Sequence, residues 1–163
     1  MSMTLILLIQ FSTLAYAFIG GVFLAFSDFI MRSLAQTEGH GGLEAMQAIN
    51  REVFHWIFMA LFLGMAALSL VVAGFGAFAL TGLGGKLIML SGLVYLTGCF
   101  GVTVFCNIPM NEALAGMTAA SESTRDYWLQ TYVPRWTFWN SVRTTACAIS
   151  AALLFLGLIC VLQ

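Results

Sequence analysis

Charge is what this sequence has least of. Only 8% of its 163 residues are Asp, Glu, Lys or Arg, against 61% hydrophobic residues, and the mean hydropathy is +0.96. A soluble domain of this length could not cover so much apolar surface, so the composition indicates a chain that lies in a lipid bilayer. The formal net charge of −1 also argues against the basic face that a nucleic-acid partner requires. We therefore expect membrane lipid around the protein and no nucleic acid.

Metal-binding and redox motifs are also scarce. The chain has two histidines, His40 and His55, and its four cysteines form no C-x-x-C pair. Glu52 and His55 have the E-x-x-H spacing of carboxylate-bridged di-iron helices, but such a site needs a second copy of the motif and two more glutamates. We therefore predict no metal site and no cofactor. We interpret the cysteines as small packing residues.

Long apolar runs are what the sequence has in quantity. Four of them, separated by more polar connections, cover residues 3–31, 45–80, 86–112 and 134–162. Each is long enough for a helix to cross about 30 Å of hydrocarbon. The predicted fold class is all-α: a single membrane domain that forms a transmembrane four-helix bundle, up-down-up-down, with helices two, three and four extended beyond the membrane on one side. The sequence leaves open whether Pro109 kinks or ends the third helix.

The polar residues are distributed unevenly between the two ends of such a bundle. Four spans bring both termini to one end, where the connection between the second and third spans carries only Lys86. The opposite end, called the charged end below, receives all seven acidic residues, both histidines and the five arginines. The bias in Lys and Arg predicts that the charged end of this multi-pass protein faces the cytoplasm.

Arg143 lies where the last apolar run begins, because residues 145–162 carry no charge. On a helix Trp136, Asn140, Arg143 and Cys147 follow the spacing i, i+4, i+7 and i+11, which places them on one face. A guanidinium at this depth is costly unless it faces the bundle and finds partners there. The sequence therefore predicts that this face points inward.

Amide and aromatic side chains of the other spans are predicted to reach the same depth as Arg143. These are Gln47, Asn50 and Phe54 of the second span, Asn107 and Asn111 of the third, and Trp136, Trp139 and Asn140 of the fourth. Two interpretations are open. One is an interhelical hydrogen-bond network that only holds the bundle together, and the other is an aromatic-walled pocket for an oxygen-rich, planar or anionic ligand. Tyr127, Trp128 and Tyr132 are interpreted as interfacial anchors.

Four motifs in this order resemble the anthrone oxygenase-like family, a set of small four-helix membrane proteins. They are Phe26-Ser27-Asp28-Phe29-Ile30-Met31, Ala45-Met46-Gln47-Ala48-Ile49-Asn50, Asn107-Ile108-Pro109-Met110-Asn111, and Trp136 to Thr144. The most specific parts are N-x-P-x-N and W-x-x-W-N-x-x-R-T, each of which occurs once. The resemblance covers nearly the whole chain.

The resemblance implies an oxygenase that converts anthrones to anthraquinones with molecular oxygen as co-substrate and no cofactor. It assigns His55 or Asp28 as catalytic base; Arg143, Asn140 and Asn111 as oxyanion donors; Trp136, Trp139 and Phe54 as ring-stacking walls; and Gln47, Asn50 and Asn107 as further substrate-binding amides. The competing hypothesis is a non-catalytic membrane protein that binds a small hydrophobic molecule or lipid, or serves as a scaffold. A homo-oligomer is compatible with both hypotheses.

Overall fold

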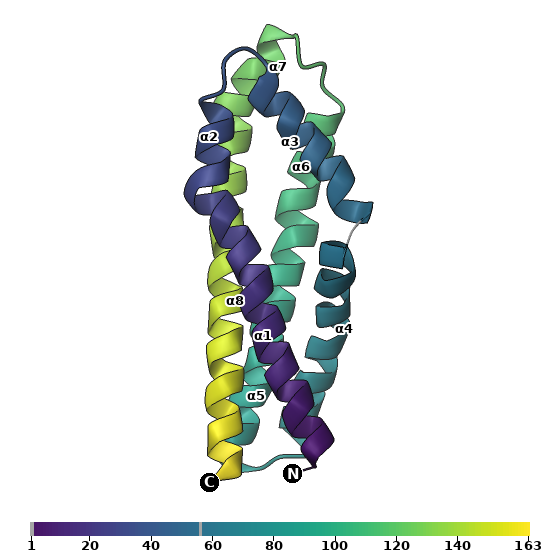
Figure 1. The fold of residues 1–163 in the computed structure, drawn as a ribbon, viewed down its shortest axis with the longest axis vertical. Helices are drawn as coiled ribbons and strands as arrows, with labels where there is room; N and C mark the ends of the chain where they lie inside the picture. Colours follow the sequence, from purple (N-terminus) through teal and green to yellow (C-terminus); the bar gives the residue numbers. More distant parts are fainter. Residues whose placement is uncertain (1, 56) are drawn as a thin grey trace.

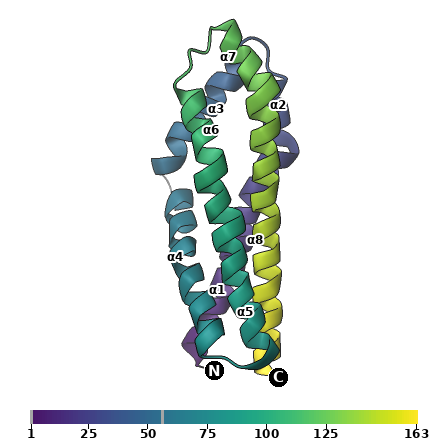
Figure 2. The same ribbon diagram turned by 180° about the vertical axis from the view of Figure 1, so that it is seen from behind.

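The computed structural model describes residues 2–55 and 57–163. Within that part of the chain the secondary structure is helical, and four long helices are apolar and long enough to cross a membrane (Figures 1 and 2). Their bounds are Met3–Ala35, Ile57–Phe78, Gly82–Ala115 and Glu122–Leu162. Both termini lie at the same end of the bundle (Figure 1). The predicted all-α, four-span fold is confirmed.

Each long helix is built from consecutive segments that differ in winding. The first long helix comprises α1 (Met3–Ala25), a π-helical segment η1 (Phe26–Ile30) and α2 (Met31–Ala35), and the second is α4 (Ile57–Phe78). The third comprises α5 (Gly82–Val94), the π-helical segments η3 (Tyr95–Gly101) and η4 (Thr103–Asn107), and α6 (Ile108–Ala115). The fourth comprises α7 (Glu122–Tyr127), the π-helical segment η5 (Trp128–Tyr132) and α8 (Val133–Leu162). Three of the four long helices thus contain wide turns, which often occur at functional sites.

The bundle exposes apolar side chains on its outside, as a surface in contact with lipid requires. Phe11, Leu14 and Phe18 of α1 are 54%, 71% and 62% exposed. In the most apolar part of each span about a third of the residues are buried, and in the third span slightly fewer. The interior contacts form one apolar core that includes Tyr16, Phe62, Tyr95 and other buried side chains of all four helices.

The level of the membrane boundary follows from helix lengths. Phe23, Phe58, Thr103 and Arg143 each lie about twenty residues along their helix from the end that carries the termini. At a rise of 1.5 Å per residue this is about 30 Å, the thickness of the hydrocarbon core. A bilayer that begins at the termini therefore ends at the level of Arg143, and the helices continue beyond it.

A second apolar core lies beyond that boundary, at the charged end. Its buried members are Met31, Leu43, Met46, Leu114, Trp128, Tyr132 and Trp136. Trp128 and Tyr132 are only 4% and 0% exposed, so the interpretation of these two residues as interfacial anchors is wrong. They are buried because the fourth helix begins at Glu122, well outside the membrane, and other helix ends cover it.

The amphipathic helix α3 (Gly41–Glu52) is one of the elements that cover the start of the fourth helix (Figure 1). It is separate from α4, so the predicted second span, 45–80, is divided into two helices. A short 3₁₀ turn, Val53–His55, separates it from α4, and residue 56 lies outside the described part of the chain. The division has a physical reason. Leu43 and Met46 pack into the second core, whereas α4 packs along α5 inside the membrane, and one straight helix could not do both.

Pro109 neither ends nor breaks the third long helix, which continues to Ala115. It lies at the start of α6, immediately after the wide turn η4, where the N–H of Ile108 bonds to the carbonyl of Thr103. Proline is tolerated at the start of a helix because its missing N–H is one of the donors that a helix start leaves free. The rewinding before Pro109 therefore allows the chain to continue in the same direction.

Close approach of α4 and α5 depends on glycine, and this gives a prediction. A Cβ at Gly92 would lie 2.4 Å from the carbonyl oxygen of Ser69, whereas one at Gly74 would have nothing within 4 Å. We expect Gly92→Val to lower the unfolding free energy by about 1–3 kcal/mol, because the clash is with backbone. Thermal melts in detergent should show a lower melting temperature for this variant and little change in melting temperature for the control Gly74→Val. Equal melting temperatures would contradict the observed helix spacing.

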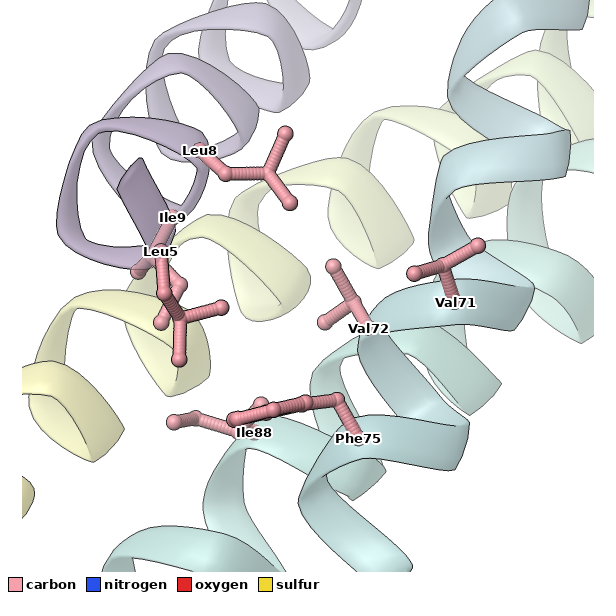
Figure 3. Close-up of a pocket in the computed structure, with 7 residues that line it drawn as sticks. All are labelled: Leu5, Leu8, Ile9, Val71, Val72, Phe75 and Ile88. Carbon is pink, nitrogen blue, oxygen red and sulfur yellow. The ribbon is translucent and has the colours of Figure 1, made fainter. Parts of the chain in front are cut away.

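An apolar cleft lies at the opposite end of the bundle from Arg143, between α1, α4 and α5 (Figure 3). Leu8, Val72, Phe75, Ile88 and neighbouring aliphatic side chains line it. Its lining side chains are all apolar, so they offer a ligand no hydrogen-bonding side chain.

Candidate functional site

Arg143 is buried at the membrane boundary, with only 5% of its surface exposed. It lies where α8 leaves the hydrocarbon, on the inward face that the sequence predicts. Its guanidinium carbon lies 4.1 Å from the centroid of the Phe23 ring and 5.3 Å from that of Trp136. Cation–π contacts of this kind favour a desolvated cation, although they do not neutralise it.

The hydrogen-bond acceptors of Arg143 are neutral. Nη2 donates to Oδ1 of Asn140 at 2.5 Å, and Nη1 donates to Oγ1 of Thr103 at 3.2 Å. Nε is buried and has no hydrogen-bond partner within residues 2–55 and 57–163. A buried charge without a counter-ion is costly in a protein interior. The arrangement therefore suits an additional, negatively polarised oxygen beside the guanidinium.

Asn140 connects Arg143 to the first long helix. Its Nδ2 donates to the carbonyl oxygen of Phe23 at 2.5 Å and to Oγ of Ser27 at 2.6 Å. Both acceptors lie where α1 passes into the wide turn η1, a place where the regular helical bonding pattern shifts. Because Nδ2 is committed to these two acceptors, Oδ1 must face Arg143. The amide thus holds the guanidinium in one orientation.

A second level of hydrogen bonds lies farther from the membrane. Oδ1 of Asn111 accepts from the hydroxyl of Tyr132 at 2.8 Å and from Nε1 of Trp136 at 2.9 Å. Nδ2 of Asn50 donates to the same tyrosine oxygen at 3.2 Å, which ties α3 to this level. Trp128, Tyr132 and Trp136 stack along one face of the fourth helix, with centroids 5.3 and 6.3 Å apart. Trp136 therefore belongs to both levels.

Asn107 lies between the two levels and is 1% exposed. Its Nδ2 donates to the carbonyl oxygen of Trp136 at 3.4 Å, and its Oδ1 has no partner in the described part of the chain. Within residues 2–55 and 57–163, Nε of Arg143 and Oδ1 of Asn107 are thus a buried donor atom and a buried acceptor atom of this site without a hydrogen-bond partner. Both belong to residues that contact Trp136.

Gln47 is placed at the edge of this site. Its Nε2 donates to the carbonyl oxygens of Leu114 at 2.8 Å and Met117 at 3.1 Å, at the end of α6. The carbonyl of Leu114 also accepts from the N–H of Met117, so Gln47 adds a side-chain donor where α6 ends. Gln47 and Asn50 therefore share one function in the fold, which is to hold α3 over the charged end of the bundle.

Four of the predicted site residues lie apart from this cluster. Asp28 and His55 are exposed, Phe54 is 60% exposed, and the ring of Trp139 packs edge-on against Phe138. No group of three or more His, Cys, Asp or Glu in the described residues is arranged to hold a metal ion. The structure thus gathers the amides, Arg143 and Trp136, and leaves the two residues predicted as bases at the surface.

Several residues of the site were not predicted from the sequence. Thr103, Phe23, Ser27 and Tyr132 all contact a predicted site residue. For Thr103 and Tyr132 a signal existed, since each precedes a predicted residue by four positions, Asn107 and Trp136, and so lies on the same helical face. Phe23 and Ser27 gave no such signal, because no predicted site residue lies four positions before or after them on their own helix.

A comparison with known protein families gives one match. The family model of anthrone oxygenase matches residues 51–153, which include Asn107, Asn111, Asn140 and Arg143 but not Asp28. No curated protein and no solved structure matches the chain. Because the matched range covers more than half of the sequence, the chain belongs to the anthrone oxygenase family.

Proposed function

We propose that the protein is a membrane oxygenase that binds the enolate of a hydrophobic aromatic ketone at Arg143. The observation that supports the proposal is the buried guanidinium, which has neutral hydrogen-bond partners and an Nε without a partner in the part of the chain that the structure describes. A planar enolate oxygen would supply the missing negative charge, and donors fixed in advance at such an oxygen are usually the largest electrostatic contribution to catalysis. Phe23 and Trp136 would contact the rings of the same ligand.

The reaction requires no reductant. An anthrone methylene and one molecule of oxygen give a carbonyl and one molecule of water, so the two hydrogens of the methylene leave with one oxygen atom. In this proposal Arg143 and Asn140 hold the enolate, Asn111 and Asn107 act on the second ring oxygen or a hydroxyl, and oxygen arrives through the apolar interior. No cofactor is part of the proposal.

Proton removal is assigned to the surface of the site. Asp28 and His55 are exposed near the level where the substrate would enter, and either could take a proton before the enolate reaches Arg143. Phe54 and Trp139 would contact the aromatic ligand at that entrance, while Gln47 and Asn50 would act by holding α3. The charged end would face the cytoplasm, following the bias in Lys and Arg.

Isotope labelling tests the proposed reaction. We expect the protein in lipid nanodiscs to convert anthrone to anthraquinone under ¹⁸O₂ faster than empty nanodiscs, with label in the new carbonyl, because the enolate is stabilised before it meets oxygen. Mass spectrometry and oxygen consumption measure the result. Spontaneous oxidation provides the background rate, and a rate no higher than this background, with protein shown to be folded, would remove the proposal.

A second function is favoured by the hydrogen bonds themselves. Asn140 bonds to the first long helix, Asn107 to the fourth, and Gln47 to the end of α6, so the same groups hold the bundle together. In a non-catalytic scaffold or binding protein this would be their whole role. The two functions differ in what removal of Arg143 does to stability, since a guanidinium kept only for structure should stabilise the fold.

A further inference from the structure

Two free cysteines face each other inside the membrane part of the bundle. Sγ of Cys147 lies 3.4 Å from Sγ of Cys99, and both residues are 0% exposed. Cys99 lies in the wide turn η3 and Cys147 in α8. The two other cysteines, Cys106 and Cys160, are half-buried and exposed, respectively.

The backbones at this point are close enough for the two thiols to react with each other. A Cβ at Gly98 would lie 2.7 Å from Cβ of Ala146, so the helices cross at the residues adjacent to the cysteines. A Cβ at Gly20 would lie 2.9 Å from Cβ of Cys147, which brings α1 to the same crossing. Disulfides require Cα atoms about 4.4–6.8 Å apart, a separation that only such a close crossing allows between helices. Little movement is therefore needed to form a bond.

The backbone of Cys147 lies about 6 Å along the axis of α8 from that of Arg143, because each residue adds 1.5 Å. Cys147 follows Arg143 by four residues on the same buried face of α8. Thr103 connects the other side, because its Oγ1 donates to the carbonyl oxygen of Cys99 at 2.8 Å and accepts from Nη1 of Arg143. A ligand at the guanidinium would thus be next to the thiol pair.

We propose that Cys99 and Cys147 form a redox-active dithiol whose electron acceptor is a lipid-soluble quinone bound at Arg143. Three observations point to a quinone. The thiols lie within hydrocarbon, so the acceptor must dissolve there. A dithiol gives up two electrons and two protons together, as a quinone takes them up. The buried Nε of Arg143, without a partner in the described residues and beside the aromatic rings of Phe23 and Trp136, is a donor for a quinone carbonyl oxygen. The inference rests on the ligand site of the proposed function, although not on its oxygenase chemistry.

The step is balanced by the two partners alone. The Sγ–H bonds of Cys99 and Cys147 break and one Sγ–Sγ bond forms, which releases two electrons and two protons. The quinone takes up both electrons and both protons and leaves as a hydroquinone. The dithiol is oxidised and the quinone is reduced.

The test uses full-length protein in nanodiscs and duroquinone, whose methyl groups prevent direct addition of thiols. We expect one duroquinol for each disulfide, and peptide mass spectrometry should place that disulfide between Cys99 and Cys147. Cys99→Ser and Cys147→Ser should abolish both products, whereas Cys106→Ser and Cys160→Ser should not. Arg143→Met should slow the reaction by about tenfold or more, the effect of one lost charge-assisted hydrogen bond.

Several results would overturn the inference. One is that Cys99 and Cys147, after treatment with duroquinone and denaturation, can still be alkylated. The others are a disulfide that includes Cys106 or Cys160, and an undiminished rate of duroquinone reduction by folded Arg143→Met. If that variant does not fold, the wild-type protein supplies a second measurement with tetrathionate, an anionic oxidant confined to water. Tetrathionate should oxidise the cysteines more slowly than duroquinone does. Faster oxidation by tetrathionate would also overturn the inference. Anthrone oxidation by Cys99→Ser distinguishes the two proposals, because it should persist even where duroquinone reduction is lost.

Discussion

Asn140→Leu is expected to lower the free energy of unfolding by about 3–5 kcal/mol, the usual cost of leaving a buried charge without its partner. The substitution removes the 2.5 Å bond from Nη2 of Arg143 and the two bonds to Phe23 and Ser27. Leucine keeps the branching and the number of side-chain heavy atoms of asparagine, so lost packing contributes only a minor part. Unfolding by denaturing detergent measures the difference.

The double variant Arg143→Met/Asn140→Leu should be more stable than Asn140→Leu by at least about 2 kcal/mol, because the unpaired charge is then absent. Thr145→Leu is the matched control, since Thr145 is exposed on the same helix and its hydroxyl donates to the carbonyl oxygen of Ser141 in that helix. Equal losses in the single and double variants would mean that the guanidinium carries no buried cost. Arg143→Met alone separates the two functions: it should destabilise a structural lock and leave a ligand site as stable or more stable.

Arg143→Met is also expected to reduce anthrone turnover by about 10²–10³-fold, the typical effect of removing one donor from an oxyanion site. Nε, a buried donor without a partner among the described residues, is the group that would meet the enolate oxygen. Arg143→Lys keeps a charge but loses the planar fork, so we expect an intermediate rate. Anthraquinone formation above the spontaneous rate is the measurement.

Arg135→Met provides the control for this experiment. Arg135 lies on the same helix, is exposed, and has the same charge to lose. Its turnover should match that of the wild-type protein. If both variants lose activity equally, a general electrostatic effect of the charged end explains the result, and if neither loses activity, the oxyanion role of Arg143 is wrong.

Much of the architecture could be read from patterns within single helices. The predicted spans 3–31, 86–112 and 134–162 each fall within one continuous helix. The inward face of the last helix is confirmed as well, because Trp136, Asn140, Arg143 and Cys147 are all no more than 5% exposed. These successes share a cause, since hydrophobicity and helical spacing depend on residues close together in the chain.

The division of the second span was less accessible. The stretch 45–80 contains no proline and changes gradually from amphipathic to apolar, so nothing local marks the turn after Glu52. The turn exists because Leu43 and Met46 of α3 pack into the second core. The other members of that core come from the first, third and fourth long helices and not from α4. Trp128 and Tyr132 were misjudged for the same reason, because the residues that bury them are distant in the sequence.

By itself the sequence determined a four-span bundle with one charged end and an arginine on an inward face at the membrane boundary, because these follow from composition and helical period. Only the tertiary structure decided what that arginine meets: Asn140 and Thr103 as acceptors, Phe23 and Trp136 as ring faces, and the thiol pair one turn below. Partners such as Phe23 and Asn140 are separated by more than a hundred residues. Their meeting depends on helix crossings and wide turns, which no local pattern encodes.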